Sequence, residues 1–195
     1  MVVYGDDPAL NDAAFAIWVM LYMGQDDVKL LDGTLNDWIA AGLPAESQIN
    51  TKKPVSYEPK IRTELLVDHD NVVRENAQIV DARNFMEYAK KPLRGSIRID
   101  PEQVLNSGRI KDPAQLNETL SRLNVNQTAV VYSEAGLDAA IVWFVLLLSG
   151  YDSRLYGWDD KTEQLSLRIG GTNITRLGTS ETVPGTSSKY KKLGK

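Results

Sequence analysis

Residues 130–140 read VVYSEAGLDAA, and the apolar run IVWFVLLL follows them at 141–148. Valine and tyrosine predict a short buried strand at 130–132, Gly136 indicates a tight loop, and the apolar run is typical of a buried helix. A loop that leaves a strand and opens a helix directs several backbone N–H groups into one small concavity, where the helix dipole adds positive potential. The stretch therefore predicts an anion-binding loop, with Ser133 where such a field would activate a nucleophile.

The same strand, loop and helix pattern occurs near the start of the chain. VVY at 2–4 and DAAFAIW at 12–18 repeat the VVY and DAAIVWF of the later stretch in the same order. Both predicted helices end at a glycine, Gly24 in the first copy and Gly150 in the second, and a short strand-like segment follows each glycine. Because the order of the pieces is kept, we interpret the two segments as an internal duplication.

The two copies differ in what surrounds them. Further structure, starting near Tyr57, precedes the second copy, whereas the first copy begins on its central strand. Residues 1–43 therefore match the C-terminal half of a first domain. A shortened chain would explain this, and so would a partner that completes the sheet; the shortened chain is favoured. A homodimer, or a partner chain that completes the first domain, stays open.

The rest of the chain divides by its periodicity. Residues 44–59 have none and predict a linker. Residues 161–195 predict a C-terminal extension, with a hairpin signal and then a Thr-, Ser-, Gly- and Lys-rich end that we expect to be mobile. Residues 60–160 alternate strand-like runs with helical segments, one of them opened by Asp112 and Pro113. This alternation predicts a complete α/β domain in which helices flank a central parallel sheet, whose ligands bind beyond the strand carboxyl ends.

The composition limits the chemistry that residues 1–195 can carry. They include no cysteine and a single histidine, His69, and their net charge is −4. The absence of cysteine excludes disulfides, thiolate ligands and cysteine nucleophiles from this stretch. A single histidine is too few for a multi-histidine metal site and leaves a Ser–His relay only one candidate base. We therefore expect no metal and no cofactor, and the acidic balance argues against nucleic acid and membrane partners.

Two features bear on where the protein works. The start of the chain has neither the basic residues nor the long apolar run of a signal peptide. The most apolar stretch, 140–148, is too short to span a bilayer. We expect a soluble protein of the cytoplasm or the periplasm, with the periplasm slightly favoured.

Several short segments of the second half occur in a characteristic order. They are VDAR at 80–83, EY at 87–88, RGSIRI at 94–99, GRIKDP at 108–113, VVY with the loop after it, and LYGW at 155–158. In this order they resemble the rhodanese family, specifically its tandem-domain thiosulfate sulfurtransferases. The resemblance covers residues 60–160, and residues 1–43 are similar to the second half of the family's first, non-catalytic domain. It implies a rhodanese-like fold.

The resemblance also implies a place for the chemistry. The family transfers a sulfane sulfur from thiosulfate or a persulfide donor to an acceptor, through a cysteine persulfide in a loop Cys-x-x-Gly-x-x-Ala. The frame of this loop is kept at 133–139, but Ser133 takes the place of the cysteine. The thiolate is the attacking species in such exchange, a hydroxyl has a far higher pKa, and oxygen cannot form the S–S bond. We therefore expect no sulfur transfer through Ser133.

The predicted site is the loop together with the strand end beside it. Ser133 holds the nucleophile position, and the residues expected to line the active-site loop are Glu134, Ala135, Gly136, Leu137, Asp138, Asp81 and Arg83. Glu134 and Asp138 lie at a helix N-terminus, where the dipole stabilises their carboxylates and where they would repel thiosulfate. Because the neighbourhood does not suit an anion, a natural loss of the cysteine is favoured over an engineered replacement. The simpler roles are a helix cap for Ser133 and an ion pair for Asp81 and Arg83.

Two functions follow from this site. The favoured one is a catalytically inactive rhodanese-like protein that acts as a binding or regulatory module, taking an unknown protein or small molecule on the former active-site face. The alternative is a thiosulfate or persulfide sulfurtransferase whose cysteine was substituted at position 133 or lies in a segment outside this sequence. A serine hydrolase is disfavoured, because the loop lacks the glycines of a nucleophile elbow. A cysteine-phosphatase-like site lacks both its cysteine and its loop arginine.

Overall fold

The fold is built on β8 (Ala129–Tyr132), a strand whose four residues are all buried. In the computed structural model the described residues are 1–5, 10–47, 51, 53–68, 76–91, 95–134 and 136–157, with the backbone of 166–169 and 172–175. β8 has β4 (Gln78–Asp81) on one side and β9 (Ser153–Tyr156) on the other, both parallel to it. Its Ala, Val, Val and Tyr suit a strand that is covered on both faces.

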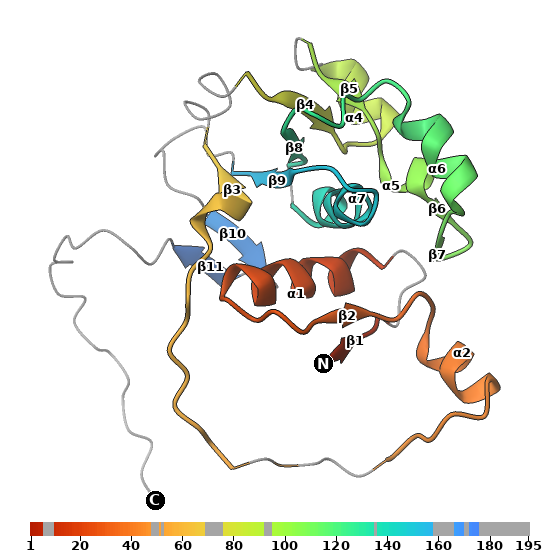
Figure 1. The fold of residues 1–195 in the computed structure, drawn as a ribbon, viewed down its shortest axis with the longest axis vertical. Helices are drawn as coiled ribbons and strands as arrows, with labels where there is room; N and C mark the ends of the chain where they lie inside the picture. Colours follow the sequence, from red (N-terminus) through yellow and green to blue (C-terminus); the bar gives the residue numbers. More distant parts are fainter. Residues whose placement is uncertain are drawn as a thin grey trace, which may run out of the picture.

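Two shorter strands extend this sheet at its edges. β3 (Leu66–Val67) pairs with β9, and β5 (Ile97–Arg98) pairs with β4, so the order is β3-β9-β8-β4-β5 with every pair parallel. Helices lie around the sheet (Figure 1), which confirms the predicted α/β class with a central parallel sheet. Because all five strands run the same way, β4 and β8 end at one edge, where Asp81 pairs in register with Tyr132.

Short helices connect the strands of this part. Its remaining elements are η1 (Thr63–Leu65, a 3₁₀ turn), α4 (Phe85–Lys90), α5 (Pro101–Val104), β6 (Leu105–Asn106), β7 (Arg109–Ile110) and α6 (Pro113–Leu120). The side chains of Asn84, Asp100 and Asp112 accept hydrogen bonds from the first turns of α4, α5 and α6, respectively. The start of α6 is the one that the sequence predicts. The strands β6 and β7 form an antiparallel pair.

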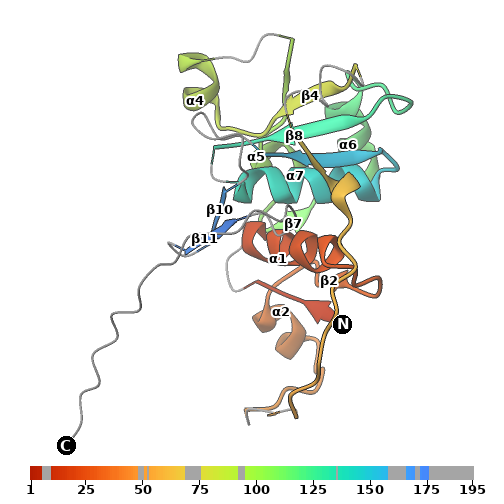
Figure 2. The same cartoon turned by 90° about the vertical axis from the view of Figure 1, so that its left-hand side faces the viewer.

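The middle of α7 (Leu137–Leu148) is buried, whereas its last two residues are exposed. Every residue from 139 to 146 is inaccessible or almost so, as its apolar sequence predicts. On its far side α7 packs against α1 (Asn11–Tyr22), whose Ala14, Ile17 and Trp18 belong to the same hydrophobic core. Figure 2 shows α7 lying between the five-stranded sheet and α1. The two parts of the chain are thus joined through this pair of helices, and also through Asp32 and Asp37, which bind Ile110 N–H and the Arg109 side chain of β7.

The N-terminal part repeats the arrangement of the later one. β1 (Val2–Val3) and β2 (Lys29–Leu30) flank α1 in sequence and pair in parallel, just as β8 and β9 do around α7. They lie on the side of α1 that faces away from α7 (Figure 2). α2 (Leu35–Ala40) follows, with a capping box between Thr34 and Asp37. The strand–helix–strand order therefore agrees with the duplication inferred from the sequence.

The remaining segments are simpler. The described residues of the predicted linker, 44–59, form no helix or strand. β10 (Ser166–Ile169) pairs antiparallel with β11 (Thr172–Thr175), as the hairpin signal predicts, and the turn between them lies outside the described residues. The domain boundaries at 43, 59 and 160 stay predictions. None of the helices in the described ranges has the length and apolar character needed to cross a bilayer.

Candidate functional site

The loop between β8 and α7 gathers backbone donors around the side chain of Ser133. The Ser133 hydroxyl oxygen accepts hydrogen bonds from the N–H of Gly136 at 3.0 Å and from the N–H of Ala139 at 3.2 Å. Gly136 makes this turn with a φ of 80°, in the left-handed region that favours glycine. Ser133 is only 7% exposed. The hydroxyl thus lies in the predicted concavity and takes donors that an anion would otherwise use.

Asp81 and Arg83 meet at the end of β4, beside this loop. The Arg83 guanidinium donates from Nε to Asp81 Oδ1 at 2.9 Å and from Nη2 to Oδ2 at 2.6 Å, and both side chains are buried. Nη2 also donates to the Lys91 carbonyl, and the guanidinium carbon lies 5.1 Å from the centre of the Tyr132 ring. The hydrogen bonds with Asp81 raise the pKa of Arg83. Arg83 Nη1 lies 3.7 Å from the exposed carboxylate of Glu134. Through Tyr132 and Glu134, the Asp81–Arg83 pair therefore connects the end of β4 to β8 and to the loop.

Asp138, in the first turn of α7, has an environment that disfavours its charge. It is half-buried, and its Oδ1 accepts a hydrogen bond from Asn11 Nδ2 at 2.8 Å. Burial, followed by the nearby carboxylates of Glu87 and Asp100, raises the pKa of Asp138. We expected the helix dipole to stabilise this carboxylate. Burial and the two like charges act in the opposite direction to the dipole.

Helix α4, whose Glu87 lies close enough to raise the pKa of Asp138, also carries exposed apolar side chains. Phe85 and Met86, at the start of α4, are 63% and 66% exposed. The Arg98 guanidinium carbon lies 5.8 Å from the centre of the Phe85 ring, and Arg98 forms an ion pair with Asp100. The face around the loop therefore combines an accessible aromatic ring with carboxylates, and its arginines are held by acidic partners.

Sequence reasoning missed the three side chains that act on Asp138. Asn11 donates a hydrogen bond to it, and Glu87 and Asp100 are nearby carboxylates that raise its pKa. The segment DPEQ at 100–103 is a helix-start signal that could have marked Asp100 as an N-cap. The duplication predicts two equivalent helices, but it does not predict that the first residue of one contacts the first turn of the other. Such contacts follow from tertiary packing alone.

The other predicted site residues have simpler surroundings. Leu137 is the first residue of α7 and packs, partly buried, against the core. Ala135 and His69 lie outside the described residues. No group of three or more His, Asp or Glu side chains that could hold a metal occurs in the part of the chain that the structure describes. The functional roles of the loop residues stay predictions.

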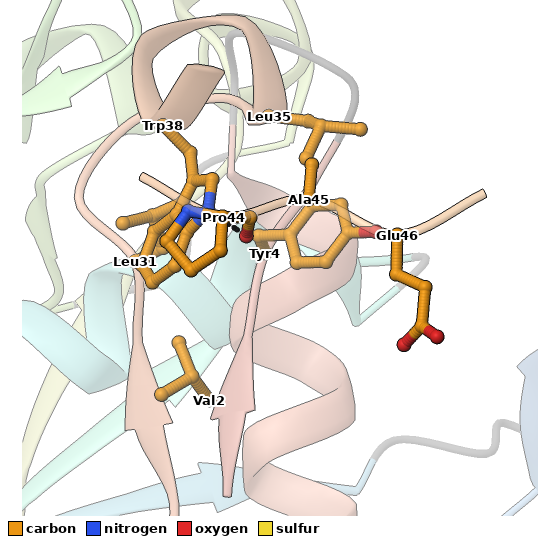
Figure 3. A pocket seen from close by; sticks show the side chains of 8 residues that line it. All are labelled: Val2, Tyr4, Leu31, Leu35, Trp38, Pro44, Ala45 and Glu46. Carbon is orange, nitrogen blue, oxygen red and sulfur yellow. Dashed lines mark hydrogen bonds between the residues drawn. The ribbon is translucent and has the colours of Figure 1, made fainter. Parts of the chain in front are cut away.

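A separate cavity of about 300 Å³ lies in the N-terminal part. The residues that line it are Val2, Tyr4, Leu31, Leu35, Trp38, Pro44, Ala45 and Glu46. Figure 3 shows the rings of Tyr4, Trp38 and Pro44 on its walls, near the carboxyl ends of β1 and β2. Trp38 Nε1 donates to the Pro44 carbonyl at 2.9 Å, which fixes the start of the linker against the indole. The lining includes no residue of the Ser133 loop, so the two features are distinct.

The part of the chain that contains the Ser133 loop matches a known family. Residues 66–159 match the family model described as rhodanese-like domain. The chain is 27% identical over 181 residues to the sulfur carrier protein TtuD of Thermus thermophilus, covering 77% of this chain and 62% of the relative. It is 28% identical over 174 residues to a thiosulfate sulfurtransferase of Corynebacterium glutamicum, covering 75% of this chain and 56% of the relative. Residues 66–159 of the chain belong to the rhodanese family.

The rhodanese fold is also that of a solved protein, the 3-mercaptopyruvate sulfotransferase SseA of Escherichia coli. The two structures align with a TM-score of 0.69 and 23% sequence identity, over 82% of this chain and 66% of that chain. This likeness shows the fold. The rhodanese chain spans less than two thirds of the length of the two curated relatives above. Ser133 and its loop lie within the matched residues 66–159.

Proposed function

We propose that this rhodanese protein does not transfer sulfur through residue 133 and instead acts as a binding module, with its ligand on the face around the Ser133 loop. The observation that supports this is the pair of hydrogen bonds that the Ser133 hydroxyl accepts from the backbone of Gly136 and Ala139. In the family's loop frame this is the place of the persulfide-bearing cysteine. A hydroxyl oxygen there cannot form the S–S bond of a persulfide, and it acts as a cap for α7.

The charges around the loop support a ligand other than thiosulfate. The exposed carboxylate of Glu134 lies beside the loop, and the carboxylates of Glu87 and Asp100 are close enough to Asp138 to raise its pKa. Arg83 is held by Asp81 in a buried ion pair, which leaves its charge largely compensated. An anion approaching this face would meet carboxylates first. A ligand with a positive charge and an apolar part fits the rim better, because the Phe85 ring is exposed there.

The second candidate is a sulfurtransferase that carries cysteine at position 133 or outside this sequence. The features that favour it are the retained loop geometry, with Gly136 in the left-handed region and two N–H groups aimed at one atom. A curated relative is named a thiosulfate sulfurtransferase, and another a sulfur carrier protein. If this candidate were right, restoring a thiol at position 133 would restore the chemistry.

The deciding experiment is the transfer of sulfur from thiosulfate to cyanide by the wild type and by Ser133→Cys. The control is Ser149→Cys, which places a thiol on the exposed residue that ends the same helix. We expect no turnover by any of the three, and no added sulfur atom on Cys at position 133 by mass spectrometry after exposure to thiosulfate. Turnover by Ser133→Cys alone would show that the pocket is still built for the reaction and would overturn the proposal.

The binding role is tested by backbone amide NMR with two aromatic probes of opposite charge. Phenethylamine carries a cation and phenylacetate an anion on similar bodies. We expect phenethylamine to shift the amide signals of Phe85, Ser133 and Gly136, and phenylacetate to leave them in place. Glu134→Gln should weaken the shifts, whereas Glu118→Gln, on the exposed side of α6, should not. Shifts with phenylacetate only, or with neither probe, would count against the proposed binding face.

A further inference from the structure

The contact between Asn11 and Asp138 leaves one polar atom without a partner. Asn11 Nδ2 donates to Asp138 Oδ1 at 2.8 Å, across 127 positions of the chain. The other end of the same amide, Asn11 Oδ1, is buried and has no hydrogen-bond partner among the described residues. Buried carbonyl oxygens are nearly always hydrogen-bonded, so an orphan beside a carboxyl group calls for a donor.

The chemistry of the two groups provides that donor. An ionised carboxylate has only acceptors, so it can receive one hydrogen bond from the amide but can give none back. A protonated carboxyl group has one O–H donor. An amide and a carboxylic acid can therefore form two hydrogen bonds side by side, N–H to carboxyl oxygen and O–H to amide oxygen. Asn11 and Asp138 already make the first of these bonds.

We propose that Asn11 is a positioning residue of the Ser133 loop, and that it pairs with the protonated form of Asp138 through two hydrogen bonds, one of which is lost when the proton leaves. The pair joins the first residue of α1 to the first turn of α7, five positions after Ser133. It would hold the loop against the N-terminal part of the chain most firmly at low pH. The proposal does not depend on whether the loop transfers sulfur.

The charged groups around Asp138 favour its neutral form. Glu87 on α4 and Asp100 at the start of α5 face it with like charge. α7 carries no other charged residue, and the neighbouring carboxylate on α1, Asp12, is exposed. The arginines of this face, Arg83 and Arg98, pair with other carboxylates. Burial adds to the effect of the two like charges, and together they raise the pKa of Asp138.

The sign of a pKa change on substitution separates this pair from an ordinary hydrogen bond. If Asn11 only donates to a carboxylate, Asn11→Ala removes a bond to the charged form, and the titration of Asp138 moves to higher pH. If Asn11 Oδ1 also accepts from the acid, the substitution removes two bonds from the neutral form and only one from the ionised form, and the water that it admits solvates the carboxylate, so the titration moves to lower pH. The carboxyl carbon signal of Asp138, followed by NMR across pH, reports the direction.

A second variant keeps the test valid if Asn11→Ala folds poorly. Asp138→Asn has the shape of the protonated acid and a permanent N–H donor for Asn11 Oδ1. We expect wild-type stability in urea to fall as pH rises through the titration of Asp138, and this component of the fall to disappear in Asp138→Asn. Asp12→Asn, the control one residue along α1, should retain it. In the wild type, the side-chain carbonyl carbon of Asn11 should shift with the same midpoint as Asp138.

Three outcomes would overturn the proposal. They are a titration of Asp138 that moves upward in Asn11→Ala, an Asp138→Asn protein whose stability depends on pH as steeply as that of the wild type, and an Asn11 carbonyl signal that ignores the titration of Asp138. Each would show that the amide oxygen of Asn11 does not accept a hydrogen bond from the protonated carboxyl group of Asp138.

Discussion

Replacing Arg83 with methionine removes the charge partner of a buried carboxylate and should strongly destabilise the fold. The side chains of Asp81 and Arg83 are 0% and 3% exposed. Of its described hydrogen bonds, the Asp81 carboxylate would keep only the one from the backbone N–H of residue 83. Breaking a buried pair in this way costs about 3–5 kcal/mol, because the remaining charge is uncompensated. With an m-value of roughly 2 kcal/mol per M, the urea midpoint should fall by about 1.5–2.5 M.

The chain contains a matched pair for comparison. Asp152 and Arg154 have the same spacing at the start of β9, with Nη2 and Oδ2 3.0 Å apart, but the Asp152 side chain is 55% exposed. Arg154→Met should therefore lower the free energy of unfolding by about 1 kcal/mol or less. Combining Asp81→Leu with Arg83→Met removes both charges and should recover part of the loss. Equal midpoints for the two methionine variants, or a double variant as unstable as the summed single ones, would refute the anchoring role given to this pair.

Two further substitutions test helix starts. Ser133→Ala removes the acceptor of the Gly136 and Ala139 N–H groups and should lower the free energy of unfolding by about 0.5–2 kcal/mol in urea, whereas an unchanged midpoint would mean that Ser133 does not cap α7. Hydrogen bonds from the backbone and side chain of Thr34 lower the pKa of Asp37. These bonds therefore stabilise the fold at pH values above the ordinary pKa of about 3.8, and this stabilisation is lost as pH falls through the lowered pKa. Thr34→Ala removes the side-chain part, and the Asp37 carboxyl signal in NMR should then titrate closer to its ordinary value; an unmoved titration would show that the hydroxyl has no such effect.

The features that the sequence predicted well depend on local physics. The length and apolar character of the run after residue 136 favour a buried helix, and Asp112 before Pro113 is a local signal for a helix start. The strand ends at Asp81 and Tyr132 are neighbours because parallel strands in one sheet finish at one edge. These statements need only the order of elements along the chain, and the structure confirms them.

The features that the sequence did not predict depend on how distant elements pack. The dipole of α7 alone would favour the charged form of Asp138. The groups that surround its carboxyl group, however, come from α1, α4 and the start of α5. Asn11 reaches it because α1 lies on α7, and an apolar helix face specifies that two helices meet without specifying which end residues touch. The cavity beside Tyr4 and Trp38 likewise needs β1, α2 and the linker in place at once. No local signal encodes such a meeting.

The two proposals are linked through the proton on Asp138. A neutral Asp138 keeps both hydrogen bonds to Asn11 and leaves Glu134 as the exposed carboxylate beside Ser133. An ionised Asp138 loses one bond to Asn11 but adds a negative charge at the start of α7, where a cationic ligand would benefit from it. Tight positioning of the loop and strong attraction for a cation therefore favour opposite protonation states. A ligand of this charge would bind more tightly as pH rises, and by linkage it would release the proton that holds α1 to the loop.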